Sequence, residues 1–206
     1  MSNAHPKWEP HNHPQYDATL LREGEELRIE LDERSAVEDF LRDSRPAHNR
    51  LYRALTPVTH LEYAGTYRGT QGSSLEDRVI FAPHFDGTDR LRQFVLPQMV
   101  KSYMDVAFKD AVARVLVTSV GTSSDHFVQC ARLFYVFGLI HPFLDGNGHI
   151  QRLMFDRAIG LNRKISLSTK WTVHPRPYSE EMAQAFDAEP AAQSVANVLR
   201  SYVTLG

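Results

Sequence analysis

Cysteine is almost absent from this sequence, which has only Cys130 among its 206 residues. A disulfide framework inside the chain is therefore excluded, and a reducing compartment such as the cytoplasm is expected. The sequence also lacks an apolar run near the roughly 18 residues that a transmembrane helix needs, and it lacks the apolar segment of a signal peptide. These absences predict a cytoplasmic protein without a membrane partner. Export as a secreted effector, by a route that leaves no signal, stays open.

An excess of either charge is also missing. Lysine and arginine number 23 against 25 aspartate and glutamate residues, which gives a formal net charge of −2. Such a balance provides no general attraction to nucleic acid, and no nucleic-acid partner is expected. The hydrophobic content of 42% and the length of 206 residues suit one globular domain, with or without an N-terminal extension. The oligomeric state, a homo-oligomer included, is left open.

What the sequence does contain is a dense group of chemically useful residues between His141 and Arg152, in the order HPFLDGNGHIQR. Apolar helical patterns precede and follow it, at about 124–140 and 148–160, so the segment is predicted to form a tight loop between two helices. It is not a P-loop, because no Lys-Ser or Lys-Thr pair follows the glycines. This loop is the candidate site.

Each residue type in this loop suits the handling of a phosphate group. Gly146 and Gly148 allow a sharp turn that exposes backbone N–H groups, and the following helix points its N-terminus at the same place. Asp145 offers a hard oxygen ligand for Mg²⁺, and Arg152 lies one helical turn further on, within reach of phosphate oxygens. His141 is the side chain best suited to accept a hydroxyl proton near neutral pH.

The segment resembles the signature of the Fic (Fic/Doc) family, H-x-F-x-[D/E]-G-N-G-R-x-x-R, and matches all but one of its defined positions. The resemblance implies a compact all-α helical bundle that transfers AMP from ATP to a Ser, Thr or Tyr hydroxyl of a protein, the enzyme itself included. It also implies that His141 is the general base and that Asp145 holds Mg²⁺. The nucleoside triphosphate would be bound by the remaining motif positions, which are Gly146, Asn147, Gly148, His149 and Arg152.

His149 is the one departure, since the family usually has an arginine at this position. Histidine is shorter than arginine and mostly neutral at pH 7, so the sequence predicts a weaker or pH-dependent hold on the triphosphate. Three alternatives to AMP transfer from ATP stay open. The protein could remove AMP from a modified hydroxyl, use another nucleotide donor, or bind nucleotide as a weakly active regulator.

A second resemblance lies near the N-terminus, where residues 19–24 read TLLREG. They are similar to the family's inhibitory helix pattern, [S/T]-x-x-x-E-[G/N], in which the glutamate pairs with the second motif arginine. The similarity implies that Glu23 keeps the γ-phosphate from Arg152, or that it orients a water molecule in the reverse reaction. A helix that simply ends with Gly24 as its C-cap is the alternative.

Helical periodicity, prolines and the resemblance to the Fic family together imply four parts of the chain. Residues 1–16 are expected to be a disordered tail, 17–59 an N-terminal helical extension with the inhibitory segment, 60–165 the Fic core, and 166–206 C-terminal helices packed on it. Helices are expected at about 17–31, 35–55 with a break at Pro46, 91–103, 107–120, 124–140, 148–160, 178–187 and 190–203.

Residues 65–83 interrupt the helical pattern. Glycines and polar residues precede the β-rich run 79–83, and this combination predicts a β-hairpin. The hairpin resembles the family's flap, which lies over the active site and pairs with the backbone of the protein substrate. Tyr67 and Arg68 are the residues expected to dock the target there.

Overall fold

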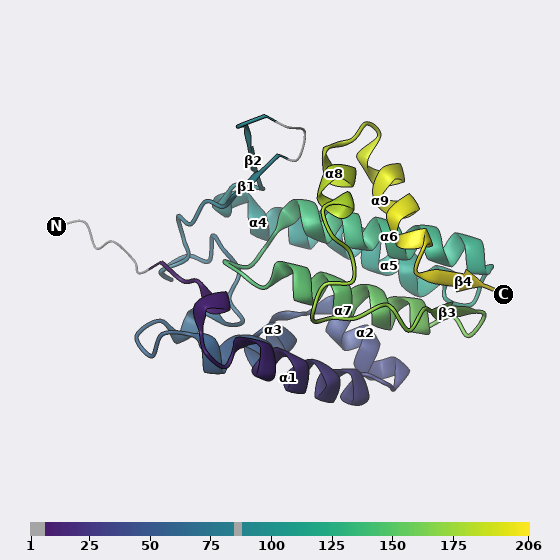
Figure 1. Ribbon diagram of the computed structural model, residues 1–206, viewed down its shortest axis with the longest axis horizontal. Helices are drawn as coiled ribbons and strands as arrows, with labels where there is room; N and C mark the ends of the chain where they lie inside the picture. Colours follow the sequence, from purple (N-terminus) through teal and green to yellow (C-terminus); the bar gives the residue numbers. More distant parts are fainter. Residues whose placement is uncertain (1–6, 85–87) are drawn as a thin grey trace.

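The computed structural model describes residues 7–84 and 88–206, and its regular structure is mostly helical, with two small sheets (Figure 1). The predicted all-α fold is confirmed. The helices, in chain order, are α1 (Tyr16–Glu30), α2 (Arg34–Arg42), α3 (Arg45–Tyr52), α4 (Pro97–Tyr103), α5 (Lys109–Thr118), α6 (Ser123–Ile140), α7 (Asn147–Gly160), α8 (Glu181–Asp187) and α9 (Ala191–Arg200).

Helices α6 and α7 form the centre of the fold, joined by the short loop that the sequence marks as the candidate site. Figure 1 shows α1 to α3 on one side of α7 and α5 with α6 on the other. Helix α6 begins after Thr122, whose hydroxyl accepts a hydrogen bond from the backbone N–H of Asp125 at 3.1 Å, as N-cap residues do. Because α7 is covered on several sides, the loop at its N-terminus is held by neighbours from distant parts of the chain.

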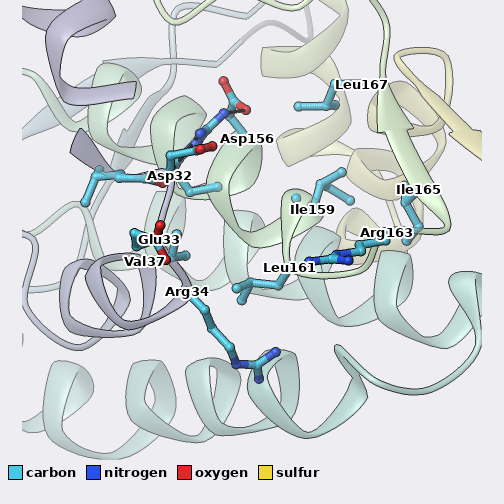
Figure 2. Close-up of a pocket in the computed structure, with 13 residues that line it drawn as sticks. Asp32, Glu33, Arg34, Val37, Asp156, Ile159, Leu161, Arg163, Ile165 and Leu167 are labelled. Carbon is cyan, nitrogen blue, oxygen red and sulfur yellow. Dashed lines mark hydrogen bonds and ion pairs between the residues drawn. The ribbon is translucent and has the colours of Figure 1, made fainter. Parts of the chain in front are cut away.

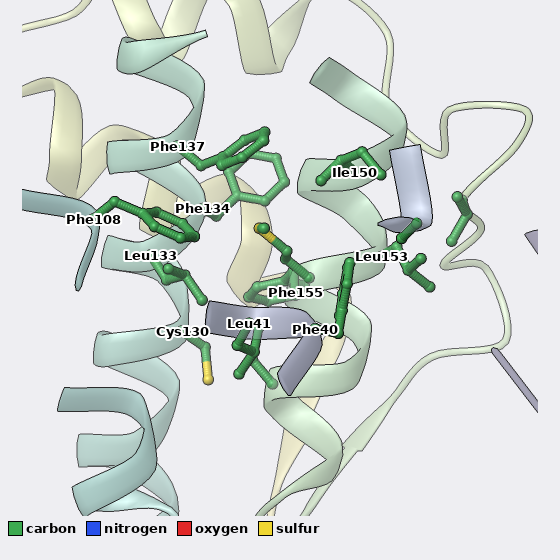
Figure 3. Packing of buried hydrophobic residues seen from close by; sticks show 14 of the residues in the cluster. Phe40, Leu41, Phe108, Cys130, Leu133, Phe134, Phe137, Ile150, Leu153 and Phe155 are labelled. Carbon is green, nitrogen blue, oxygen red and sulfur yellow. The ribbon is translucent and has the colours of Figure 1, made fainter. Parts of the chain in front are cut away.

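The contact between α6 and α7 is an aromatic and aliphatic core (Figure 3). Phe134 and Phe137 of α6 are buried together with Leu153 and Phe155 of α7. Each such side chain stabilises the fold by about 1.5–3 kcal/mol through burial. Cys130 lies in the same core and is fully buried, as expected from its place in an apolar helical run, and burial raises its pKa well above the usual value.

Part of the N-terminal segment is packed against the fold, in contrast to the expected disordered tail over 1–16. Residues 1–6 lie outside the described residues. Residues 7–16 pack against the helices, and the Trp8 indole N–H donates to the carbonyl of Leu55 at 3.0 Å. The Trp8 ring is buried against Tyr52 and Tyr63. The prolines do prevent long regular structure here, but one large aromatic side chain is enough to fix the segment.

The hairpin lies further along the chain than the glycines indicate. Strand β1 (Phe81–Pro83) pairs antiparallel with β2 (Leu91–Gln93), with Ala82 opposite Arg92. The predicted hairpin over 65–83 is therefore wrong in its bounds, because residues 65–78 form turns and the second strand comes from the start of the predicted helix 91–103.

The helix after this hairpin begins only at Pro97, which occupies its first turn, where a missing N–H costs no hydrogen bond. Helix α4 then runs through a π-helical turn (Met104–Phe108) directly into α5. The two helices expected at 91–103 and 107–120 are thus one continuous helical stretch from Pro97 to Thr118.

The C-terminal part folds back onto α6 and α7. Strand β3 (Ile165–Leu167) pairs antiparallel with β4 (Val203–Leu205), a sheet that the sequence does not predict. Between the two strands lie α8 and α9, and α9 packs on α6. The helices predicted here at 178–187 and 190–203 both exist, over shorter ranges. Over the described residues, none of the helices has the length and apolarity needed to cross a membrane.

Candidate functional site

His141 follows the last residue of α6 and has a left-handed backbone, with φ of 52° and ψ of 60°. It is the only non-glycine residue with positive φ among those described. Such a conformation is uncommon for a side chain other than glycine and persists only where the surroundings hold it. The imidazole ring stacks on Phe94, with 3.9 Å between ring centroids and 18° between planes. The hairpin segment thus lies directly over this histidine.

Arg68 is the residue that holds the backbone of His141. Its guanidinium is buried and donates to the carbonyl of His141 from Nε at 3.0 Å and from Nη2 at 2.8 Å. Further bonds go to the carbonyls of Ile140, Val95 and Arg78, at 3.1, 3.0 and 3.0 Å. Burial lowers the pKa of Arg68 to about 10. One cation therefore ties the end of α6 to the segments before and after the hairpin.

That Tyr67 and Arg68 dock a protein target stays a prediction, and the surroundings of the two side chains do not favour it. Both precede the hairpin rather than belonging to it, and the Arg68 side chain points into the protein. The Tyr67 ring lies 4.9 Å from the ring of Phe143, and burial raises its pKa to about 12. Both side chains contact the loop between α6 and α7, Tyr67 through Phe143 and Arg68 through the carbonyl of His141.

His141 is neutral at physiological pH. Burial is the main cause that lowers its pKa to about 3, and the charges of Arg68 and Arg92 act in the same direction. A hydrogen bond between the ring and the backbone of Gly138 opposes this shift. A neutral imidazole has one nitrogen with a free lone pair, which is the form a general base needs.

The turn that follows is stabilised from within. The Asn147 side chain accepts from the backbone N–H of Phe143 at 2.9 Å and donates to the carbonyl of Phe143 at 2.8 Å. The Asn147 side chain is buried and closes the loop, and the expected part of this residue in nucleotide binding stays a prediction. Gly146 has φ of 75°, and a Cβ there would lie 2.3 Å from Cε2 of Tyr52. Both its conformation and its contact with Tyr52 require glycine.

His48 is a supporting residue that the sequence does not reveal. Its ring is fully buried and stacks on Phe143 at 3.8 Å between centroids. Because its Nδ1 accepts from the backbone N–H of Gly65 at 2.9 Å, its Nε2 donates to the carbonyl of Asp145 at 2.9 Å. Burial lowers the pKa of His48 to about 3. No local pattern marks this histidine, since it lies on α3, far from the loop in sequence.

Asp145 offers one carboxylate for a cation. One of its oxygens accepts from the backbone N–H of Gly146 at 2.5 Å, and burial raises its pKa. Among the described residues there is no group of three or more acidic, histidine or cysteine side chains that would form a complete metal site. A single carboxylate suits Mg²⁺, which normally takes one or two protein oxygens and completes its shell with phosphates and water. The donor set therefore fits a nucleotide-bound Mg²⁺.

His149 faces away from the ligand side of the loop. Its Nδ1 lies 2.7 Å from the Tyr52 hydroxyl, and its Nε2 lies 3.0 Å from Nδ1 of His174. His174 in turn contacts the Asp17 carboxylate on α1 through Nε2 at 3.0 Å. Since the carboxylate can only accept, the chain of hydrogen bonds runs from Tyr52 through both histidines to Asp17. His149 is thus used to connect the motif to α1, and the prediction that it binds nucleotide is not supported by its geometry.

The predicted pair between Glu23 and Arg152 is not formed. The Glu23 carboxylate accepts from Nε of Arg50 at 2.9 Å and from Nη2 of Arg22 at 2.8 Å. Arg152 donates from Nε to the carbonyl of Val173 at 2.7 Å. The reason lies in the packing of α1 on α3, which brings Arg50 to Glu23 and leaves Arg152 to the C-terminal segment.

A cavity of about 240 Å³ lies beside His141. From the loop and α7 it receives His141, Gly148 and Arg152, which are the predicted site residues that the structure brings together around it. Among the described residues that line it, none is acidic and three are arginines, so it favours an anionic ligand. Its remaining lining residues come from α6, α7, the hairpin region and the C-terminal segment and are Ala82, Pro83, Arg92, Phe94, Gly138, Gln151, Arg176, Tyr178, Ser179, Met182, Ala183 and Phe186.

A larger cavity, of about 590 Å³, lies elsewhere, between the start of α2, the end of α7 and strand β3 (Figure 2). Asp32, Asp156, Arg34 and Arg163 are among its lining residues, so both signs of charge face it. It contains no residue of the 141–152 segment. Size alone does not identify the site, and the smaller, cation-lined cavity is the one with the reactive side chains.

Comparison with known proteins shows the family of the chain. The sequence profile of the Fic/DOC family matches residues 47–159, which is more than half of the 206-residue chain. The matched region begins within α3, two residues after its start, includes His48, and extends through the hairpin and α6 to α7. Residues 7–46 and 160–206 lie outside it. Among curated proteins, none matches the chain.

Proposed function

The chain belongs to the Fic/DOC family, and we propose on this premise that it transfers AMP from ATP to a Ser, Thr or Tyr hydroxyl of a protein. Members of the family are enzymes that move nucleotide or phosphate groups, generally with ATP and Mg²⁺, and they act on proteins. The observation that carries the proposal is the position of neutral His141 at the edge of a cation-lined cavity, beside Gly148 and Arg152.

The proposed reaction is a displacement at the α-phosphorus of ATP. The oxygen of the target hydroxyl forms a bond to this phosphorus, and the bond between the α-phosphorus and the oxygen that bridges to the β-phosphorus breaks. Pyrophosphate leaves with the bonding electron pair. The hydroxyl proton passes to the free nitrogen of His141, which is available because the ring is neutral. The products are a phosphodiester on the protein and pyrophosphate.

The remaining groups bind and orient the phosphates. Gly148 lies in the first turn of α7, where unpaired N–H groups and the positive end of the helix dipole favour an anion. Arg152 can offer both terminal nitrogens of its guanidinium to a ligand, since its hydrogen bond to the carbonyl of Val173 is made from Nε. Asp145 would hold Mg²⁺, which neutralises phosphate charge when bound.

One observation favours a second candidate, a domain that binds nucleotide but transfers little. The residue at the family's first arginine position, His149, is committed to Tyr52 and His174 and gives the triphosphate no charge. Removal of AMP from a modified hydroxyl has less support. That reaction needs a carboxylate to orient water, and no Asp or Glu is among the described residues that line the cavity.

The test is intact-mass measurement of the protein after incubation with Mg²⁺ and ATP, alone and with candidate targets. We expect a gain of one AMP unit in the wild type and none in His141→Ala or His141→Asn, with thermal melting used to confirm that both variants fold. Parallel incubations with the other nucleoside triphosphates identify the donor. A gain that persists without His141 would exclude the proposed base. Binding without any gain would favour the weakly active regulator.

A further inference from the structure

The wall of the cavity opposite the motif belongs to the C-terminal segment, which the family profile does not cover. The loop before α8 and α8 itself provide it. Gly138 of α6 makes this approach feasible, because a Cβ there would lie 2.6 Å from the Phe186 ring and 2.4 Å from the Gln151 side chain. Phe186 of this wall therefore packs closely against α6 at Gly138. Its lining residues are Arg176, Tyr178, Ser179, Met182, Ala183 and Phe186.

The two basic residues on or beside this wall differ in how they are engaged. Arg92 comes from β2, forms an ion pair with Asp187, and places its guanidinium 5.7 Å from the centre of the Phe186 ring. It thereby connects the hairpin to α8. Arg176 is exposed and has no ion pair with any of the described residues. Its charge helps to lower the pKa of Glu181, but no ion-pair contact within the described part of the chain occupies its guanidinium, so a ligand can reach it.

Arg152 and Arg176 are brought to the same place by one short stretch of chain. Arg152 donates to the carbonyl of Val173, and its guanidinium lies 6.0 Å from the centre of the Tyr178 ring. Arg176 lies between these two contacts in sequence and lines the same cavity. Both arginines line one cavity and have guanidinium N–H groups that can donate to a ligand. Such a pair suits a polyphosphate, because each guanidinium can donate two parallel hydrogen bonds to phosphate oxygens.

The same wall also offers apolar surface. Tyr178, Met182 and Phe186 line the cavity together with Phe94 from the hairpin region. Aromatic faces next to a cationic group suit a nucleobase next to its phosphates, because every base has a face that can stack. The chemistry on this wall therefore matches a nucleoside triphosphate better than inorganic phosphate alone.

We infer that the C-terminal segment 171–187 completes the nucleotide site, with Arg176 supplying the phosphate contact that position 149 lacks and the aromatic side chains of the wall contacting the base. The inference rests on the proposed function, since it names how the same cavity binds its donor. It also explains why a histidine is tolerated at position 149. The missing charge comes from a different part of the chain.

Equilibrium binding of ATP with Mg²⁺ to the full chain tests this inference. We compare the wild type with Arg176→Ala, Arg176→Lys and the control Arg163→Ala, which removes an exposed arginine from the larger cavity on another part of the surface. Arg176→Ala should weaken ATP binding at least about tenfold, the loss of a charge-assisted hydrogen bond. It should leave adenosine binding nearly unchanged. Arg176→Lys should recover part of the affinity, and Arg163→Ala should bind as the wild type does.

The outcomes separate this inference from the proposed function. If Arg176→Ala binds ATP as tightly as the wild type while His141-dependent transfer is intact, the inference is wrong and the proposed function stands. If Arg176→Ala weakens ATP and adenosine equally, Arg176 only shapes the cavity and the phosphate contact is wrong. If the wild type binds no nucleoside triphosphate at all, both fail. In steady-state assays the expected effect is a raised KM for ATP with a smaller change in kcat.

Discussion

At the scale of single residues, the proposed base His141 depends on a buried cation that is not among the described residues lining the cavity. Arg68 donates to the carbonyls of Ile140 and His141 and so fixes the point where α6 ends and the left-handed backbone begins. It is buried without a carboxylate partner among the described residues, and carbonyl oxygens solvate its charge. A lysine could not reach all of these acceptors, because it lacks the planar fork of arginine.

We therefore predict that Arg68→Lys lowers the free energy of unfolding by about 3 kcal/mol, since several buried carbonyls lose their donor. Transfer activity should fall by at least about tenfold through misplacement of His141. Urea unfolding and the mass assay measure the two effects. Arg163→Lys, at an exposed position, is the matched control and should change neither. An Arg68→Lys variant as stable as the wild type would contradict the role assigned to this residue.

At the scale of elements, α1 is connected to the site by residues other than the expected ones. Glu23, Glu26 and Glu30 all bond to Arg50 of α3, so this acidic face of α1 serves helix packing. The link from α1 to the motif is made instead by Asp17, through His174 and His149. Helix α1 is thus attached to the loop at its N-terminal end.

This arrangement predicts that Glu23→Gly does not release activity. The substitution removes a contact with Arg50 and places glycine within a helix, which costs about 1 kcal/mol. AMP transfer should stay within about twofold of the wild type, because Arg152 is not occupied by Glu23. Glu26→Gly, which loses a contact with the same arginine, is the control. A tenfold rise in transfer for Glu23→Gly alone would show that the glutamate reaches Arg152 in another conformation and acts as the family's inhibitory residue does.

At the scale of the whole molecule, the cavity is assembled from three stretches that are distant in sequence. The α6–α7 loop provides His141, the hairpin region covers it with Phe94, and residues 171–187 close the opposite side. The ion pair between Arg92 and Asp187 joins the second and third of these. His48, His141 and His149 lie around this cavity, and burial keeps each of them neutral by lowering its pKa. Protonation of these side chains would therefore destabilise the folded protein.

Stability should therefore decrease in mild acid. Burial holds the pKa of His48 at about 3 in the folded protein, whereas the pKa of a histidine in the unfolded chain is about 6.5. The unfolded chain takes up the proton first, so the contribution of His48 is complete above about pH 6.5 and is lost as the pH falls toward the folded value. Between pH 7.5 and 5.5, His48 alone should lower the free energy of unfolding by about 1.4 kcal/mol.

Urea unfolding at the two pH values measures this loss. His48→Gln should show a smaller loss than the wild type by about that amount, although it is less stable at both pH values. His11→Gln, at an exposed position, should lose as much as the wild type. If the pH dependence of stability is the same in His48→Gln as in the wild type, the pKa of His48 does not differ between the folded and the unfolded protein.

Local signals in the sequence are enough to predict the helical fold and the loop between α6 and α7. Apolar periodicity, the glycines of the turn and the residue types from His141 to Arg152 are such signals. They predict that His141, Gly148 and Arg152 lie beside one another, and all three line the same cavity. These features are accessible from the sequence because a helix and a tight turn are formed by neighbours along the chain.

The partner that each side chain meets follows only from the packing of distant segments. The strand that completes the hairpin, the inward direction of Arg68, the presence of His48 beneath the loop and the pairing of Glu23 with Arg50 all depend on it. The same holds for His149, whose ring turns toward His174, and for Arg176, which reaches the cavity from beyond the family motif. Such contacts leave no periodic trace in one sequence, because they are set by how helices pack and not by the spacing of residues along them.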